Sequence, residues 1–147
     1  MLPILSLASS APAPWAAALR KSQLKEGMRV RAFDEKRAAA TAAKDHIAKM
    51  LEAQVQKGRL AAEPAQAALD RISLADDLAA LAPANVIIEA VVERLDLKQA
   101  LFAKLDSMTG PDTILASNTS SIPITAIAAA CRSPERVCGM HFFNPCR

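Results

Sequence analysis

Short apolar runs that alternate with longer helix-forming segments restrict the fold of this sequence more than any other feature. Four of the runs have the length of a β-strand, at residues 30–33, 86–89, 113–116 and 137–140. The run at 86–89 reads Val-Ile-Ile-Glu and is nearly all apolar, which is typical of a parallel strand buried on both faces. Because parallel strands need crossover connections, the alternation predicts an α/β protein with a parallel sheet.

The segments between the runs favour helices. Residues 35–57 contain no Gly or Pro and are rich in Ala, Lys, Glu and Gln, and Gly58 is suited to end this helix. Asp96 is expected to cap a later helix, because its side chain can accept a hydrogen bond from the first turn. The remaining predicted helical segments are 63–71, 76–81, 96–107 and 123–130.

Composition and charge argue against several classes of protein. Hydrophobic residues make up 52% of the 147 residues, which is enough for a folded core. The net charge of +3 is too small to indicate binding to nucleic acid or to an anionic membrane. No apolar run approaches the ~20 residues of a transmembrane helix. The cysteines, Cys131, Cys138 and Cys146, lack a C-x-x-C spacing, so we expect reduced thiols of a cytoplasmic protein and no metal site.

Polar side chains follow the predicted strands at their carboxyl ends, where ligands bind in open α/β sheets. Each also has a structural interpretation, as a helix cap, a solvated charge, a turn residue or a packed histidine. His46 lies in the middle of a predicted helix and is interpreted as a surface residue. The polar groups at strand ends are Asp34, residues 90–98, residues 118–121 and His141.

Three strings of residues together resemble a known family. They are VIIEAVVERLDLKQALFAKLD, TILASNTSSIPITAIA and PERVCGMHFFNP, and they are similar to the NAD-binding domain of the L-3-hydroxyacyl-CoA dehydrogenases. The resemblance covers about residues 27–145 and includes relatives that act on 3-hydroxybutyryl-CoA or 3-hydroxyadipyl-CoA. It implies a Rossmann-like parallel sheet with helices on both faces. It also implies NAD-dependent oxidation of an L-3-hydroxyacyl-CoA to a 3-ketoacyl-CoA, as in fatty-acid β-oxidation or aromatic-acid breakdown.

The resemblance implies a role for each polar residue near the reacting groups. His141, of H-F-F-N-P, corresponds to the general base that takes the proton from the substrate 3-hydroxyl, and Ser120 hydrogen-bonds that oxygen. Glu93 and Lys98, of V-V-E-x-x-x-x-K, and Asn118, of S-N-T-S, correspond to residues that line the nicotinamide and its ribose. Histidine suits its role because its pKa lies near neutrality, and a general base contributes about 10²–10⁴ in rate.

Two more residues are assigned to the distant parts of the ligands. Asp34 corresponds to the acid after the second strand that binds the adenosine ribose hydroxyls, and a carboxylate there repels a 2′-phosphate, which favours NAD over NADP. Lys57 corresponds to a lysine late in the long helix that contacts the coenzyme A of an acyl-CoA substrate. Members of the family are homodimers.

The N-terminal segment 1–26 departs from the family pattern, whereas residues 27–147 follow it as a truncated Rossmann domain. Family members begin with a strand and G-x-G-x-x-G, whose N–H groups hold the pyrophosphate, but no glycine precedes Gly27 here. Residues 4–8 are expected to fill the central strand and residues 15–26 to form a helix. The proline-containing loop between them is expected to hold the cofactor poorly, because proline has no N–H to donate.

The C-terminus departs from the family as well. The chain ends six residues after His141, before the family's base-orienting glutamate, a substrate-contacting asparagine and the helical dimerisation domain. We therefore expect this chain to be weakly active or inactive on its own. The alternatives are a non-catalytic remnant, a crystallin-like structural relative, or another NAD-dependent β-hydroxyacid dehydrogenase, although H-F-F-N-P argues against the last.

Both departures are consistent with two single-base frame changes in a dehydrogenase gene. The string SSAPAPWAAALRKSQLK can be encoded by codons whose reading from the third base gives VGAGTMGRGIAQVAAQ, a glycine-rich fingerprint. Loss of one G from codons for the family's N-P-V-P-L gives Pro-Cys-Arg and a stop, as at this terminus. We offer this as a hypothesis that sequencing the encoding DNA tests.

Overall fold

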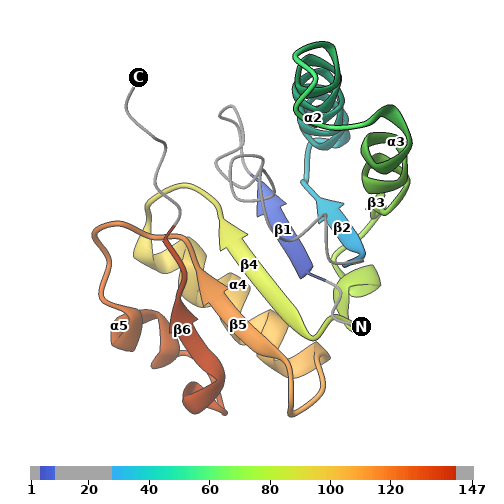
Figure 1. Ribbon diagram of the computed structural model, residues 1–147. Helices are drawn as coiled ribbons and strands as arrows, with labels where there is room; N and C mark the ends of the chain where they lie inside the picture. The colour runs from blue at the N-terminus through green and yellow to red at the C-terminus, as the bar shows by residue number, and fades with distance from the viewer. Residues whose placement is uncertain (1–3, 9–27, 142–147) are drawn as a thin grey trace.

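A computed structural model of the protein describes residues 4–8 and 28–141, and in this part the strands form one parallel sheet (Figure 1). The strand order is β3-β2-β1-β4-β5-β6, so the chain winds outward from β1 in both directions. This is the order of dinucleotide-binding α/β domains, and it confirms the predicted Rossmann-like sheet. The strands are β1 (Ile4–Ala8), β2 (Val30–Phe33), β3 (Ile72–Leu74), β4 (Val86–Ala90), β5 (Ile114–Ser117) and β6 (Val137–Gly139).

Strand β1 occupies the centre of the sheet, as the apolar run at its position predicts. It pairs in parallel with β2, where Ile4 lies opposite Val30, and with β4, where Ile4 lies opposite Val86. The predicted helix at 15–26 and the proline-containing loop before it lie outside the described residues. The first strand position is therefore filled without the family's sequence.

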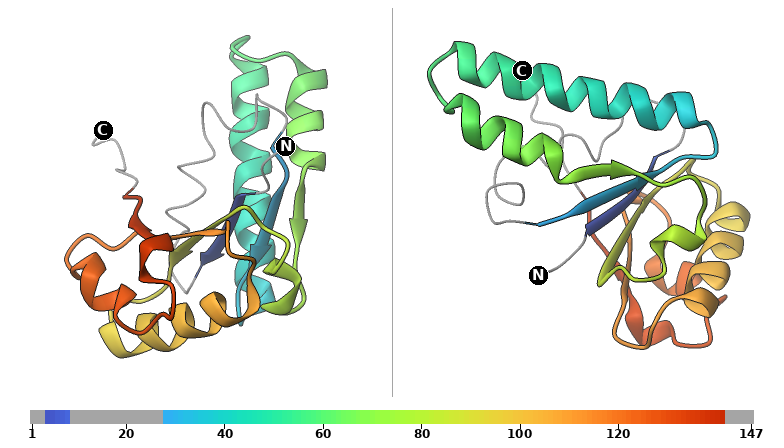
Figure 2. Two further views of the ribbon diagram at one scale, coloured as in Figure 1. Left: turned by 90° about the horizontal axis from the view of Figure 1, so that it is seen from below. Right: turned by 90° about the vertical axis from the view of Figure 1, so that its right-hand side faces the viewer.

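Helices cover both faces of the sheet (Figure 2). Helices α2 (Arg37–Gln56) and α3 (Ala62–Asp70) lie on one face, and α4 (Leu95–Met108) and α5 (Ile124–Ala128) lie on the other. Short 3₁₀ turns occur at Ala79–Leu81 and Pro134–Arg136. Gly58 ends helix α2 as predicted, because its φ of 63° lies in the left-handed region that favours glycine.

The sequence analysis missed one strand, and one of its helix caps is wrong. Strand β3 was not predicted, because its three residues follow a helix directly and are too few to show a strand period, although Ile72 is buried. Asp96 does not cap α4, since the N-cap residue is Arg94 and has extended backbone angles. Asp96 lies in the first turn and forms an exposed ion pair with Arg94, at 2.5 Å.

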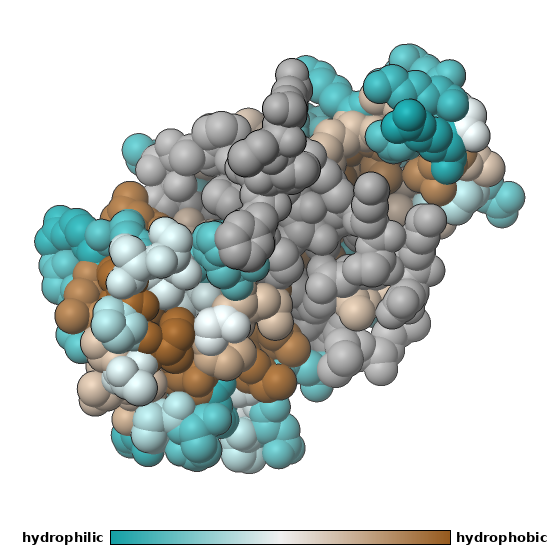
Figure 3. All heavy atoms as spheres, turned by 60° about the vertical axis from the view of Figure 1, so that its left-hand side comes forward, coloured by the Kyte–Doolittle hydropathy of each residue, from teal (hydrophilic) through white to brown (hydrophobic). Residues whose placement is uncertain are grey.

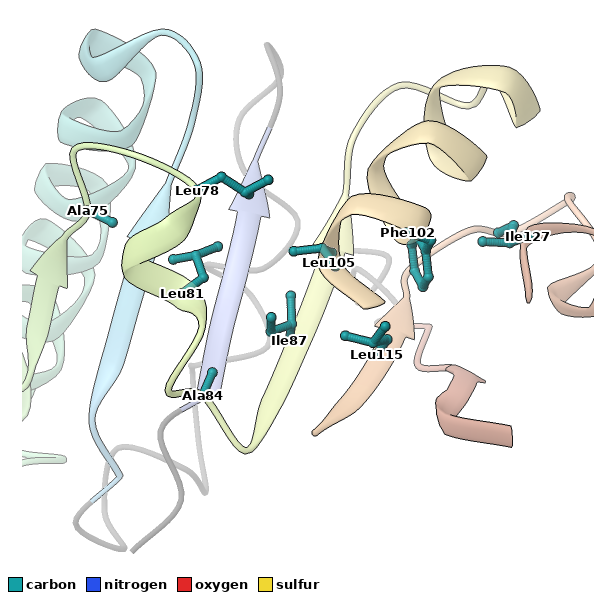
Figure 4. Packing of buried hydrophobic residues seen from close by; sticks show 9 residues of the cluster. All are labelled: Ala75, Leu78, Leu81, Ala84, Ile87, Phe102, Leu105, Leu115 and Ile127. Atoms are coloured by element: carbon teal, nitrogen blue, oxygen red, sulfur yellow. The ribbon is translucent and has the colours of Figure 1, made fainter. Parts of the chain in front are cut away.

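Strand β4 is buried on both faces, as its continuous apolar pattern predicts. Ile87 belongs to the main core, which α4 closes through Phe102 and α5 through Ile127, whereas Ile88 points to the opposite face and packs beside Ala116. Figure 4 shows the main core between β4, β5 and the helices. Because β4 is buried on both faces, its position in the sheet is fixed. The position of the turn between β4 and α4 follows from it.

Arg136 ties together the amino ends of β5 and β6 and the end of α4. Its Nη2 lies 2.5 Å from Asp106 Oδ1, and its Nη1 donates to the carbonyls of Gly110 at 2.6 Å and Thr113 at 3.1 Å. The side chains of Arg136 and Asp106 are 9% and 3% exposed. A buried pair of this kind holds β6, which leads to His141, in place beside β5.

We expect Arg136→Met to lower the free energy of unfolding by about 3 kcal/mol, because it leaves the Asp106 carboxylate buried without its partner. Urea unfolding followed by circular dichroism measures the change. Arg132→Met is the matched control, since Arg132 is exposed nearby, and it should change the free energy by less than about 0.5 kcal/mol. Equal effects of the two substitutions would contradict the stabilising role of the Arg136–Asp106 pair.

Candidate functional site at the carboxyl edge of the sheet

Four chain segments with polar side chains meet at the carboxyl edge of the sheet. Because all the strand pairs are parallel, the residues after β2, β4, β5 and β6 emerge at the same edge. The Met140 N–H donates to the Ser117 carbonyl at 2.8 Å, so the chain that leads to His141 runs beside the end of β5. The predicted convergence therefore holds for Asp34, Glu93, Asn118, Ser120 and His141.

Lys57 does not belong to this group. It is the exposed C-cap residue of α2. The 20 residues of that helix span about 30 Å and separate Lys57 from Asp34, which precedes the helix (Figure 2). A contact of Lys57 with a ligand would therefore involve a part of that ligand far from the other residues.

The carboxylate of Asp34 has one oxygen in use and one without a partner. Oδ1 accepts the Lys36 N–H at 2.8 Å, at the start of α2. Oδ2 is buried and makes no hydrogen bond to any of the residues that the structure describes, and the whole residue is only 9% exposed. A buried acceptor without a donor costs free energy, so Oδ2 is suited to a ligand hydroxyl that approaches the end of β2.

A buried ion pair that the sequence analysis missed lies under the site. Lys98 Nζ donates to Glu89 Oε1 at 2.7 Å, and these side chains are 1% and 0% exposed. The other oxygen, Glu89 Oε2, accepts the Ser117 hydroxyl at 2.6 Å. The signal in the sequence was an acidic residue at the end of an apolar strand, which a lysine nine positions later neutralises. Lys98 therefore has its ammonium directed into the protein.

Glu93 connects the turn after β4 to the loop after β5. Its Oε1 accepts hydrogen bonds from the Thr119 hydroxyl, from the Ser121 N–H at 3.2 Å and from the Ser121 hydroxyl at 2.9 Å. Its Oε2 lies 3.5 Å from Lys98 Nζ. One oxygen of this carboxylate thus contacts the loop after β5, and the other faces Lys98 on helix α4.

The loop after β5 presents one hydroxyl outward between two that are engaged. Ser120 is exposed and, within the described part of the chain, its hydroxyl makes no hydrogen bond, whereas Thr119 and Ser121 bind Glu93. Asn118 is half-buried and its N–H donates to the Glu89 carbonyl at 2.8 Å, which continues the β4–β5 ladder. The loop is therefore rigidly placed while Ser120 is left accessible.

Apolar side chains flank Glu93 on the surface. Val92 is 42% exposed and Leu95 38% exposed, and both belong to the turn that begins α4. Figure 3 shows apolar and polar surface intermixed on the side of the molecule that comes forward from the left of Figure 1. The rim of the site thus combines a carboxylate with apolar surface, which suits a ligand with rings as well as hydroxyls.

The hydrogen bonds to Glu93 change its acidity. Partial burial works to raise the pKa of this carboxyl, but the hydrogen bonds from Thr119 and Ser121 and the Lys98 charge outweigh it and lower the pKa from 4.5 to about 2. Because the pKa is lower in the folded chain, Glu93 stabilises the fold above pH 4.5, and this contribution is lost as the pH falls toward 2.

We expect Glu93→Gln to remove this part of the acid sensitivity. The stability of the unsubstituted chain should exceed that of the variant by about 1 kcal/mol or less near neutral pH, since the carboxylate is partly exposed. The difference should vanish as the pH falls from 4.5 to about 2. Melting temperatures across this range measure it, and Glu52→Gln, at an exposed position on α2, is the control. A constant difference would show that Glu93 does not titrate in this window.

Strand order and the acidic residue after β2 define a dinucleotide-binding domain of the dehydrogenase type. Comparison with known proteins specifies the family. The family described as "3-hydroxyacyl-CoA dehydrogenase, NAD binding domain" matches residues 16–147. The chain therefore belongs to the 3-hydroxyacyl-CoA dehydrogenase family, and the matching domain is the one that binds NAD.

Individual relatives agree with this assignment. The 3-hydroxyadipyl-CoA dehydrogenase of Escherichia coli is 48% identical over 119 residues, which are 81% of this chain and 25% of that protein. The 3-hydroxybutyryl-CoA dehydrogenase of Mycobacterium tuberculosis is 44% identical over 120 residues, which are 81% of this chain and 42% of that protein. This chain thus spans less than half the length of these curated relatives.

A solved structure shows the same fold. The crystal structure of 3-hydroxybutyryl-CoA dehydrogenase from Escherichia coli superposes with a TM-score of 0.89 at 41% identity, over 98% of this chain and 30% of that one. In residues 4–8 and 28–141, no helix has both the length and the apolar character that crossing a membrane requires.

Proposed function

We propose that this chain is the cofactor-binding part of an enzyme that oxidises an L-3-hydroxyacyl-CoA to the 3-ketoacyl-CoA with NAD. The observation that carries the proposal is Oδ2 of Asp34, which is buried at the end of β2, next to the centre of the sheet, and has no hydrogen-bond partner among residues 4–8 and 28–141. In this position a carboxylate oxygen without a donor fits a ribose hydroxyl of NAD, and its charge disfavours the 2′-phosphate of NADP. The relatives bear the names of hydroxyacyl-CoA dehydrogenases, which supports the substrate class.

The residues at the ends of β4, β5 and β6 fit the reacting half of the ligands. Glu93 and Asn118 are proposed to bind the nicotinamide and its ribose, and Ser120 to donate a hydrogen bond to the substrate 3-oxygen. His141 takes the proton from the 3-hydroxyl as the C–O bond becomes a carbonyl, and bound NAD supplies the acceptor for the hydride from C3. The exposure of Ser120 and His141 at one edge supports these roles.

The remaining assignments concern the surroundings of the enzyme. We propose a cytoplasmic location, supported by Cys131 and Cys138, which are free thiols. Lys57 is proposed to contact coenzyme A, which requires an extended acyl-CoA, because the helix α2 separates it from His141 and Ser120. We propose that the enzyme acts as a homodimer, as its family does.

Asp34→Asn should weaken NADH binding about tenfold or more, because the ribose loses a charged acceptor, and should leave NADPH binding nearly unchanged. Titration of the isotope-labelled chain with each nucleotide, followed by NMR, measures both dissociation constants into the millimolar range. Glu35→Gln, at the exposed next position, is the control and should leave both constants unchanged. An unaltered preference for NADH in Asp34→Asn would contradict the role of Asp34.

The chain contains two histidines, and they provide a matched test of the base. We expect His141→Gln to reduce NADH formation from 3-hydroxybutyryl-CoA and NAD about 100-fold, measured by absorbance at saturating substrate. His46→Gln, on the exposed side of α2, should have no effect. Turnover that does not depend on His141 would contradict its assignment as the general base.

A further inference from the structure

Glu89 and Lys98 surround the first peptide groups of the turn after β4. The Val91 N–H donates to Glu89 Oε1 at 2.5 Å, and Lys98 Nζ lies 3.3 Å from the Val91 carbonyl oxygen. Because Nζ also binds Glu89 Oε1, the three residues form a closed ring of hydrogen bonds. The ring starts at the end of β4 and is completed from the first turn of α4, so the turn between these elements is held from both sides.

Stability alone is a weak reason to bury this pair. Removal of two charges from water costs several kcal/mol per ion, and well-packed apolar residues of similar volume often serve as well or better. Other positions of the core follow that rule, as the apolar Phe102 and Leu105 show on the same helix. A fully buried lysine and glutamate at the edge where ligands bind therefore indicate a task other than packing.

The geometry around the ammonium shows what that task is. An ammonium group has three N–H donors, and three acceptors surround Nζ of Lys98. Glu89 Oε1 and the Val91 carbonyl take two of these directions, and the third faces Glu93 Oε2 at 3.5 Å. Glu89 thus fixes the position of the Lys98 ammonium, and the third N–H of that ammonium faces Glu93.

Glu93 needs this support because its side chain is 39% exposed and lies in a turn. A glutamate in such a position samples many rotamers in water unless both of its ends are held. Here Lys98 holds Oε2, which leaves Oε1 directed at Thr119 and Ser121 in the loop after β5. The turn after β4 and the loop after β5 are therefore held together through Glu93.

We propose that Glu89 and Lys98 are positioning residues, which hold Glu93 against the loop after β5 and so assemble the wall of the NAD site before the cofactor binds. The proposal rests on the function proposed above, and it changes the role of Lys98. Instead of contacting the cofactor itself, Lys98 acts on the cofactor through Glu93. Preorganisation of this kind raises affinity by reducing the ordering that binding requires.

Two variants and one control test the proposal. Lys98→Met removes the cation, and the double variant Glu89→Gln/Lys98→Met removes both charges, so that it folds even where the single variant does not. Lys104→Met is the matched control, because Lys104 is exposed on the same helix. The measurements on the full chain are the pKa of the Glu93 carboxyl by carbon NMR, the amide shift of Ser121, and the dissociation constant of NADH.

We expect the pKa of Glu93 to rise from about 2 toward 4.5 in both Lys98 variants and to stay low in the control. The Ser121 amide should lose the shift that reports its hydrogen bond to Glu93, and NADH should bind about tenfold more weakly, the equivalent of one ordinary hydrogen bond. A merely structural role would lower the melting temperature of Lys98→Met without moving these properties in the folded double variant.

The outcomes that overturn the proposal are distinct from failure of the proposed function. Weaker NADH binding with an unchanged pKa of Glu93 would show that Lys98 contacts the cofactor directly. An unchanged pKa together with unchanged NADH binding would show that the pair is structural. If the unsubstituted chain does not bind NADH, the proposed function fails, whereas the pKa of Glu93 and the Ser121 amide still decide whether the pair positions Glu93.

Discussion

Strand β4 is the element on which the carboxyl edge depends, because it is hydrogen-bonded on both sides and buried on both faces. It pairs in parallel with β1 and with β5, and its last residues bring Glu89 opposite Ser117. Ile87 and Ile88 face opposite cores, so the strand cannot shift by one residue without moving apolar side chains into the wrong environment. The position of Glu89, and through it of the turn that carries Glu93, follows from this double burial.

The buried ammonium of Lys98 then sets the positions of the charged groups at the carboxyl edge. Lys98 lies between two carboxylates, since its Nζ is 2.7 Å from Glu89 Oε1 and 3.5 Å from Glu93 Oε2. Since Glu89 is fully buried and Glu93 is not, the cation links the interior of the sheet to its surface. The charges at this edge are therefore part of the packing of β4 and α4, and a ligand meets a carboxylate whose direction is already set.

Much of this arrangement could be predicted from the sequence, because its periodicities are strong. The apolar runs predicted β2, β4, β5 and β6, and parallel pairing then places Asp34, Asn118 and His141 at one edge whatever the details of the loops. Strand β3 could not be predicted, because its three residues are held by pairing with β2 and carry no period of their own.

The role of Lys98 was hidden for a different reason. Its position in V-V-E-x-x-x-x-K predicts a residue at the ligand surface, and lysines are rarely buried. Burial of Lys98 depends on Glu89, which is nine residues away in sequence and reads as part of an apolar strand. Likewise, the ion pair of Asp96 with Arg94 replaces the cap that Asp96 alone would favour. Such pairings depend on side-chain directions, which one sequence does not specify.

The two edges of the sheet use buried charges differently, and this difference separates the scaffold from the site. At the amino edge, both terminal nitrogens of Arg136 donate to Asp106 or to acceptors near the ends of α4 and β5, so these hydrogen bonds join fixed elements to one another. At the carboxyl edge, the Glu89–Lys98 pair contacts Glu93, and two other groups at this edge keep unused hydrogen-bonding capacity within the described residues, namely Oδ2 of Asp34 and the hydroxyl of Ser120. An acceptor that remains unpaired while its neighbours are held by the fold costs stability in the isolated chain, and a ligand hydroxyl recovers that cost on binding.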